Sequence, residues 1–112
     1  MDNASTSWLR TASQKMSWLA ERQKVISENI ANADTPSYTA RDVEDFGDFL
    51  TRPAGRSVEI RNAKSEWGTS FDGNGVVLEE QSILAAETSG QYRLASRLYG
   101  KAHQMIATVN GK

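Results

Sequence analysis

The 112-residue sequence contains no cysteine and only one histidine, His103. The absence of cysteine excludes a disulfide framework, a thiol nucleophile and any zinc or iron–sulfur site held by cysteine. One histidine is too few for a multi-histidine metal site and leaves little for histidine-based catalysis. We therefore expect no metal and no other cofactor.

The sequence also lacks an excess of either charge and any long apolar run. Thirteen basic residues against fourteen acidic ones give a net charge of −1. The sequence therefore lacks the excess of positive charge that is typical of nucleic-acid-binding proteins. No apolar run approaches the roughly 18 residues of a membrane span. The N-terminal residues lack the charged and then apolar layout of a signal peptide. We expect no nucleic-acid partner, no membrane span and, for a protein that leaves the cytoplasm, a route without a cleaved signal.

Motifs for catalysis are missing as well. The sequence has no glycine-rich elbow that presents a nucleophile, no GxGxxG motif and no P-loop. Glu79 and Glu80 are adjacent, so they do not share a helix face, and they favour a helix N-terminus instead. His103 falls on an outer helix face, where a solvated side chain is the default. We expect no enzyme and no small-molecule substrate.

Residues 5–34 contain neither glycine nor proline, and their apolar residues recur in steps of three and four. This spacing is typical of the seam of a coiled-coil helix, here with one polar member. Thr35-Pro36 ends the predicted helix, because proline disfavours the α conformation in the residue before it. The seam consists of Leu9, Ala12, Met16, Leu19, Gln23, Ile26, Ile30 and Ala33.

The last segment repeats this pattern after a turn signal at residues 72–75. Acidic residues come first and basic residues last along it, as the helix dipole favours. Gly90 and Gly100 fall on its outer face, either as tolerated weak points or as places where a neighbouring chain approaches closely. The second seam consists of Leu84, Thr88, Gln91, Ala95, Leu98, Ala102, Met105 and Val109.

Residues 37–75 show no sustained period. Asp45–Leu50 is compatible with one helical turn, and Ser57–Asn62 and Trp67–Phe71 are candidates for short extended segments. Because so long an irregular stretch is unusual inside a compact domain, we expect a flexible or partner-ordered connector. The predicted fold class is mainly α: two long terminal helices with heptad patterns, forming an antiparallel hairpin or coiled-coil-like pair, joined by a largely irregular middle.

The two seams allow more than one arrangement. An antiparallel hairpin would bury one seam against the other. However, Trp18 and Val25 lie seven residues apart on a different face, and an exposed tryptophan there favours contact with a partner. The polar seam residues Gln23, Thr88 and Gln91 either fix the register or belong to a seam that is only partly buried.

Residues 29–38, NIANADTPSY, form the most specific motif. Asn29 and Asn32 share a face of the last helical turn, where asparagine amides can bond free carbonyls and the backbone of the next turn. Tyr38 can fold back as an anchor. The motif resembles the N-terminal signature of the flagellar axial proteins, the rod, hook and hook-associated family. Matching positions are Asn29, Ile30, Ala31, Asn32, Thr35 and Tyr38, whereas Ser37 stands where many axial proteins have glycine.

Within that family the chain is most similar to a proximal rod protein. Residues 73–81 resemble the entry into the C-terminal helix of that protein, and the short length fits a rod subunit without the extra domains of hook proteins. The resemblance implies a structural subunit of the basal-body rod that polymerises through its terminal helices and helps transmit torque from motor to hook. It also implies export through the flagellar type III channel without a cleaved signal.

The partners implied are copies of the chain itself, other rod proteins, and basal-body ring and export-gate components. A soluble helical-hairpin adaptor or export chaperone that binds one partner protein is the alternative. We expect three segments that together form one assembly domain. They are an axial helix with the signature (1–35), a connector (36–75) and a second axial helix (76–112). The residues expected to mediate assembly are Leu9, Met16, Trp18, Leu19, Ile26, Asn29, Ile30, Asn32, Thr35, Tyr38, Leu84, Ala95, Leu98 and Met105.

Overall fold

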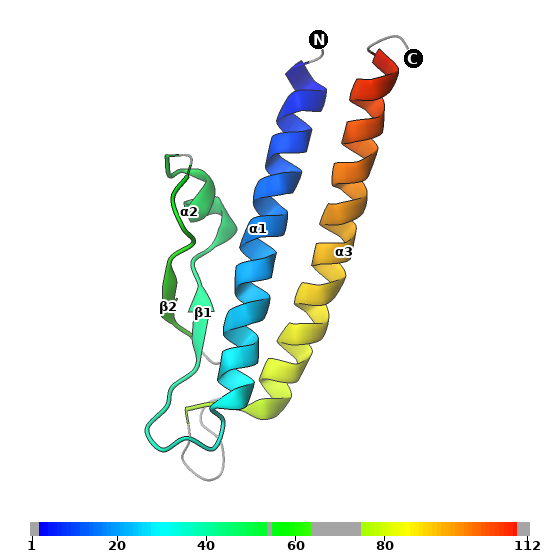
Figure 1. The fold of residues 1–112 in the computed structure, drawn as a ribbon. Helices are drawn as coiled ribbons and strands as arrows, with labels where there is room; N and C mark the ends of the chain where they lie inside the picture. The colour runs from blue at the N-terminus through cyan, green and yellow to red at the C-terminus, as the bar shows by residue number, and fades with distance from the viewer. Residues whose placement is uncertain (1–2, 54, 64–74, 110–112) are drawn as a thin grey trace.

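Two long helices dominate the computed structural model, which describes residues 3–53, 55–63 and 75–109. Helix α1 spans Asn3–Ala31 and helix α3 spans Leu78–Val109. They lie side by side and run antiparallel, so that both chain termini are at one end (Figure 1). The molecule is elongated, with a longest extent of 61 Å. The predicted mainly α fold with two long, paired terminal helices is confirmed.

The described part of the middle folds back on α1. It contains strand β1 (Arg41–Val43), helix α2 (Phe46–Leu50) and strand β2 (Ile60–Asn62). The two strands pair antiparallel, with Val43 opposite Ile60. We call these three elements the middle module, and it packs along one flank of α1 (Figure 1).

The helical turn predicted near residue 46 and one of the predicted extended segments are therefore present. Strand β1 was not predicted, because three residues are too short for a periodic signal. The extended segment predicted at residues 67–71 lies outside the described residues.

The core is small and lies where α1 meets α3 and the middle module. One cluster of buried side chains consists of Trp18, Leu19, Val25, Val43 and Ala95. Partly buried Phe46 and Phe49 of α2 pack against this cluster. The expectation of a flexible or partner-ordered connector is wrong for the described part of the middle, because α1 of the same chain supplies the surface that orders it.

The end of the molecule opposite the termini, which we call the closed end, is held by backbone pairing. The Ala40 N–H donates to the Gly75 carbonyl at 2.9 Å, and the Gly75 N–H donates to the Tyr38 carbonyl at 3.3 Å. A Cβ atom at Gly75 would lie 2.8 Å from the Thr39 Cα, so only glycine fits this approach. The other residues of the predicted turn signal, 72–74, lie outside the described residues.

Helix α1 ends earlier than predicted. Its last residue is Ala31, and the next residues form turns in which the Thr35 N–H donates to the Asn32 carbonyl at 3.0 Å. Ser37 then adopts a φ of +66°, a left-handed conformation that glycine adopts at no steric cost. This conformation explains why the related signature prefers glycine at the position of Ser37.

Candidate assembly site

Asn29 is fully buried at the closed end, and its side-chain amide links α1 to the rest of the chain. Its Nδ2 donates to the Arg41 carbonyl at 2.8 Å and to Gln81 Oε1 of α3 at 2.9 Å. Its Oδ1 accepts from the Arg41 N–H at 2.9 Å and from the Tyr38 hydroxyl at 3.2 Å. We call these four residues the Asn29 joint.

An asparagine amide has two donor hydrogens and two acceptor lone pairs, and all four are used in the Asn29 joint. Its two bonds to Arg41 are those that a neighbouring strand would make, so α1 completes the free edge of β1. An aspartate at this position would lack both donors, and an alanine would leave several buried groups unpaired. The joint therefore requires asparagine and ties α1, β1 and α3 together.

Asn32 and Thr35 have a more local role. Asn32 Nδ2 donates to the Glu28 carbonyl at 2.9 Å, and the Thr35 hydroxyl donates to Asn32 Oδ1 at 3.1 Å. Both hydrogen bonds are exposed and finish the C-terminal end of α1. The predicted use of asparagine amides at the helix end and the folding back of Tyr38 agree with these contacts.

Trp18 does not lie on an exposed face, and the expectation that it does is wrong. Its side chain is 7% exposed, and its Nε1 donates to the Glu44 carbonyl at 2.7 Å. The Phe46 ring meets it edge to face at 5.7 Å between centroids. Val25, on the same face, is also buried. The face away from the seam is covered because the middle module of the same chain packs on it.

Charged side chains of α1 flank Trp18 and hold the middle module. Arg22 forms a two-pronged ion pair with Asp42 of β1, both N–O distances being 3.1 Å. Lys15 Nζ lies 4.6 Å from the centre of the Trp18 ring and 4.4 Å from that of Phe46. Burial and the positive charge of Arg22 lower the pKa of Lys15. These contacts add cation–π attraction to the packing of the module.

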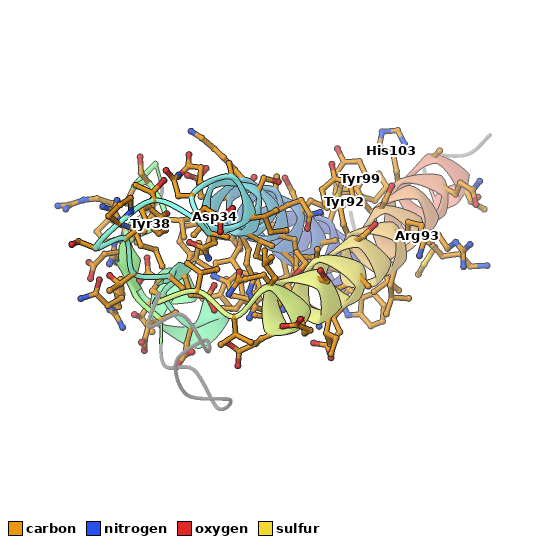
Figure 2. All side chains as sticks on the ribbon, turned by 90° about the horizontal axis from the view of Figure 1, so that it is seen from below. Asp34, Tyr38, Tyr92, Arg93, Tyr99 and His103 are labelled. Carbon is orange, nitrogen blue, oxygen red and sulfur yellow. The ribbon has the colours of Figure 1, made fainter. Side chains whose placement is uncertain are left out.

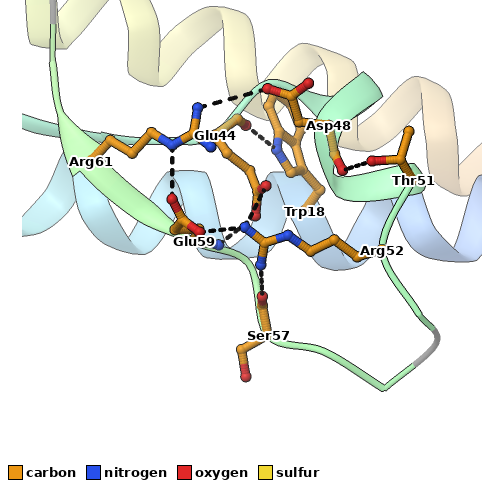
Figure 3. Close-up of polar contacts among 8 residues, drawn as sticks. All are labelled: Trp18, Glu44, Asp48, Thr51, Arg52, Ser57, Glu59 and Arg61. Atoms are coloured by element: carbon orange, nitrogen blue, oxygen red, sulfur yellow. Dashed lines mark hydrogen bonds and ion pairs between the residues drawn. The ribbon is translucent and has the colours of Figure 1, made fainter.

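A polar cluster organises the middle module itself, and sequence reasoning missed it (Figure 3). The Glu44 side chain is buried, forms an ion pair with Arg52 at 2.9 Å, and accepts from the Glu59 N–H at 2.6 Å. Hydrogen bonds from Arg61 and then Arg52 lower the pKa of Glu59. A buried acid that needs an arginine eight residues later has no periodic signature, so only the fold reveals the pairing.

The two predicted seams are not buried equally. On α1, Leu19 and Ile26 are buried and Leu9 and Met16 are half-buried, but Ile30 is 40% exposed. On α3, Ala95 is buried and Leu84 half-buried, but Leu98 is 42% and Met105 46% exposed. Of the arrangements left open by the sequence, a seam that is only partly buried is the one that fits Ile30, Leu98 and Met105.

The reason is that, among the described helices and strands, α3 packs on α1 alone. Its buried positions recur every seven residues, at Gln81, Thr88, Ala95 and Ala102. These residues form one line along α3, whereas the other half of the predicted seam turns to the side. That side exposes a row of large apolar side chains, which we call the outer stripe: Ile83, Leu94, Leu98 and Met105.

Comparisons with known proteins identify the family of this chain. A family model described as "Flagella basal body rod protein" matches residues 9–39, which include most of α1, Asn29 and Tyr38. A flagellar basal body rod protein FlgB of Agrobacterium fabrum (strain C58 / ATCC 33970) is 32% identical, over 85% of this chain and 86% of its own length. The chain belongs to the FlgB family of flagellar basal body rod proteins.

Other FlgB proteins show the same relationship. That of Escherichia coli (strain K12) is 29% identical over 88% of this chain and 89% of its own length. That of Salmonella typhimurium (strain LT2) is 43% identical over a shorter stretch, 56% of this chain and 41% of its own length. Membership of this family identifies the chain as a structural subunit of the flagellar basal body rod and not an enzyme. It also favours a structural role over the adaptor or export-chaperone alternative.

In the part of the chain that the structure describes, no helix is long and apolar enough to cross a membrane. Within the same residues, no three histidine, cysteine, aspartate or glutamate side chains are placed to hold a metal. The Asn29 joint shapes the subunit, and α3 carries exposed large apolar side chains.

Proposed function

We propose that this FlgB-family subunit polymerises into the rod through α1 and α3, with residues 1–35, 36–75 and 76–112 acting as one assembly domain. The observation that supports this is the outer stripe of α3. Its large apolar side chains follow a heptad pattern, yet 42–57% of Leu98, Met105 and Leu94 is exposed in the single subunit. Exposed apolar residues in such a row are typical of a surface that another protein covers.

The predicted assembly residues then have different roles. Those that hold the helix pair together are Leu9, Met16, Leu19, Ile26, Leu84 and Ala95, and those that fix the closed end are Asn29, Asn32, Thr35 and Tyr38. Ile30, Leu98 and Met105 are exposed and contact neighbouring subunits directly. Trp18 acts indirectly, because it fixes the middle module on α1.

The partners we propose are further copies of this chain, other rod proteins, and the ring and export-gate components at the base of the rod. An elongated subunit that joins its neighbours along two long helices is suited to transmit torque from motor to hook. The small core of the single subunit suits export as an unfolded chain through the type III channel, followed by stabilisation when neighbours bind.

The experiment that tests this proposal is a clean gene deletion, scored for swimming and for rods in electron micrographs of isolated basal bodies. We expect rings without rods, and rods restored by a plasmid copy of the parent gene. Rods of normal length in the deletion strain would overturn the structural role, provided that the genome carries no second copy.

The same strain tests the outer stripe. Plasmid copies with Leu98→Ser and Met105→Ser together should restore few rods, because the variant removes apolar area that assembly buries. Gln104→Ser, an exposed change on α3 outside the stripe, is the control and should restore rods fully. Equal restoration by the two plasmids would show that the stripe is not an assembly surface.

A further inference from the structure

A groove runs between α1 and α3 on the flank that the middle module does not line. Its volume is about 350 Å³, and it is bordered by Leu19, Ala20, Gln23, Thr88, Ser89, Tyr92 and Arg93. Tyr92, Tyr99 and His103 follow one another along this part of α3 (Figure 2). We call this groove the α1–α3 groove. None of the residues that border it belongs to the Asn29 joint or to the outer stripe.

Two buried polar atoms of the groove have no hydrogen-bond partner among the described residues: Gln23 Oε1 and Thr88 Oγ1. Thr88 is 1% exposed. Buried polar groups in native proteins are nearly always hydrogen-bonded, because an unpaired one bears its full desolvation penalty. Both residues occupy seam positions, where a polar side chain usually pairs across a helix interface and sets its register. Together these features indicate a helix interface that lacks one member in the single subunit.

The side chain that completes this interface must donate hydrogen bonds, because Gln23 Oε1 is only an acceptor. A cationic donor is disfavoured, since Arg93 already places a positive charge at the edge of the groove. A neutral amide fits both requirements, and one –NH2 group has a donor for each of the two oxygens.

The same chain presents such an amide. Gln91 is an exposed seam residue of α3. At about 100° per residue, it lies about 60° around the helix from Thr88, in the direction opposite to Tyr92. Leu98, about 80° from Thr88, lies on the same side as Gln91 and belongs to the outer stripe. One flank of α3 therefore offers an amide within an apolar row, and the other flank offers a groove with two unpaired acceptors.

We propose that the α1–α3 groove receives the Gln91 flank of α3 from a second copy of this chain. The Gln91 amide of that copy donates to Gln23 Oε1 and Thr88 Oγ1, and its neighbouring apolar side chains fill the groove. The two copies use different surfaces, so each bound copy leaves one surface free and growth is open-ended, as a helical rod requires. This inference rests on the proposed polymerisation and names the contact that performs it.

Single substitutions separate this contact from ordinary packing. Thr88→Val keeps the shape of the side chain and removes the unpaired hydroxyl, so the purified full-length subunit should unfold at a higher temperature. In the deletion strain the same variant should restore rods about fivefold less well, the expected effect of one lost hydrogen bond. Gln91→Leu should leave the melting temperature unchanged and reduce rods to a similar extent. Thr108→Val is the matched control, because the Thr108 hydroxyl is exposed and donates to the Gln104 carbonyl of its own helix.

The double variant Thr88→Val with Gln91→Leu is the sharpest test, because both sides of one hydrogen bond become apolar. We expect it to restore more rods than Gln91→Leu or Thr88→Val alone. Full restoration by Thr88→Val alone would overturn the inference, as would a lower melting temperature of that variant. Loss of rods with Thr88→Val but not with Gln91→Leu would also overturn it, and would point to a different rod protein in the groove. Failure of the parent plasmid to restore rods would refute the proposed function instead.

The absence of native cysteine allows a direct test of the occupant. Cells that produce both a Ser89→Cys and a Gln91→Cys subunit should form disulfide-linked dimers in oxidised basal bodies, whereas cells with either variant alone should not. Dimers in cells with Gln91→Cys alone would indicate a two-fold contact between identical surfaces and would overturn the head-to-tail arrangement.

Discussion

The two long helices have similar lengths and similar heptad patterns, but the folded chain treats them differently. Helix α1 is covered on two sides, by α3 and by the middle module, and its Trp18 and Asn29 are buried with all their polar atoms hydrogen-bonded. Among the described elements, helix α3 contacts α1 alone, keeps the outer stripe exposed and leaves Thr88 Oγ1 without a hydrogen-bond partner. This difference shows that the face of α1 around Trp18 and Asn29 is completed within the subunit, whereas α3 keeps a row of large apolar side chains exposed for the rod. Substitutions at Trp18 or Asn29 of α1 should therefore alter the stability of the single subunit strongly, and substitutions in the outer stripe of α3 only weakly.

Asn29→Ala should have the largest effect. It removes four hydrogen bonds, so the backbone of Arg41 and the buried side chain of Gln81 lose these partners. We expect a loss of about 3 kcal/mol or more in the free energy of unfolding, measured by urea titration of the purified subunit. The control is Asn32→Ala, whose exposed hydrogen bonds predict a loss of about 1 kcal/mol or less. Similar losses for both variants would remove the distinction between a buried joint and a helix end.

Trp18→Phe should have the next largest effect. It keeps an aromatic ring against Phe46 and removes the donor to the Glu44 carbonyl, so a loss of about 1–2 kcal/mol is expected. Hydrogen exchange should locate the effect in the middle module, with faster exchange at β1 and little change along α3. Uniformly faster exchange along both helices would mean that the module and the helix pair are one cooperative unit.

Ser37→Gly should stabilise the subunit. The left-handed backbone of Ser37 is strained for a residue with a Cβ atom and relaxed for glycine, so a gain of about 1 kcal/mol is expected. Thermal unfolding of the variant measures the gain. Gly55→Ser, at another position with positive φ, is the reverse change and should destabilise. A lower melting temperature for Ser37→Gly would show that the serine side chain contributes more than the strain costs.

Leu98→Ser should have the smallest effect on the single subunit, about 0.5 kcal/mol, because 42% of Leu98 is already exposed to water. Urea titration beside Asn29→Ala gives the direct comparison between α3 and α1. A loss as large as that of Asn29→Ala would mean that the outer stripe is already buried in the single subunit, contrary to the difference between the helices.

The sequence predicts some features of this protein well. The spacing of apolar residues is sufficient to predict both long helices, because periodicity is a local property. The NIANADTPSY motif predicts a special structure after α1, and Tyr38 does fold back onto Asn29. Asn29 was a candidate from its position alone, but its partner Gln81, 52 residues away, has no signal in the sequence. The Glu44–Arg52 pair was missed for the same reason.

Local patterns in the sequence are sufficient to predict the helical class, the lack of catalytic motifs, and the signature through which the family is recognised. Which helix faces are covered depends on the tertiary structure. A heptad pattern predicts an apolar face but not which element packs on that face. From the sequence, Trp18 could therefore contact either a partner protein or another part of its own chain. The middle module settles this by packing on α1, and it thereby leaves the outer stripe of α3 exposed. That choice depends on contacts between residues far apart in the chain, and local patterns carry no information about them.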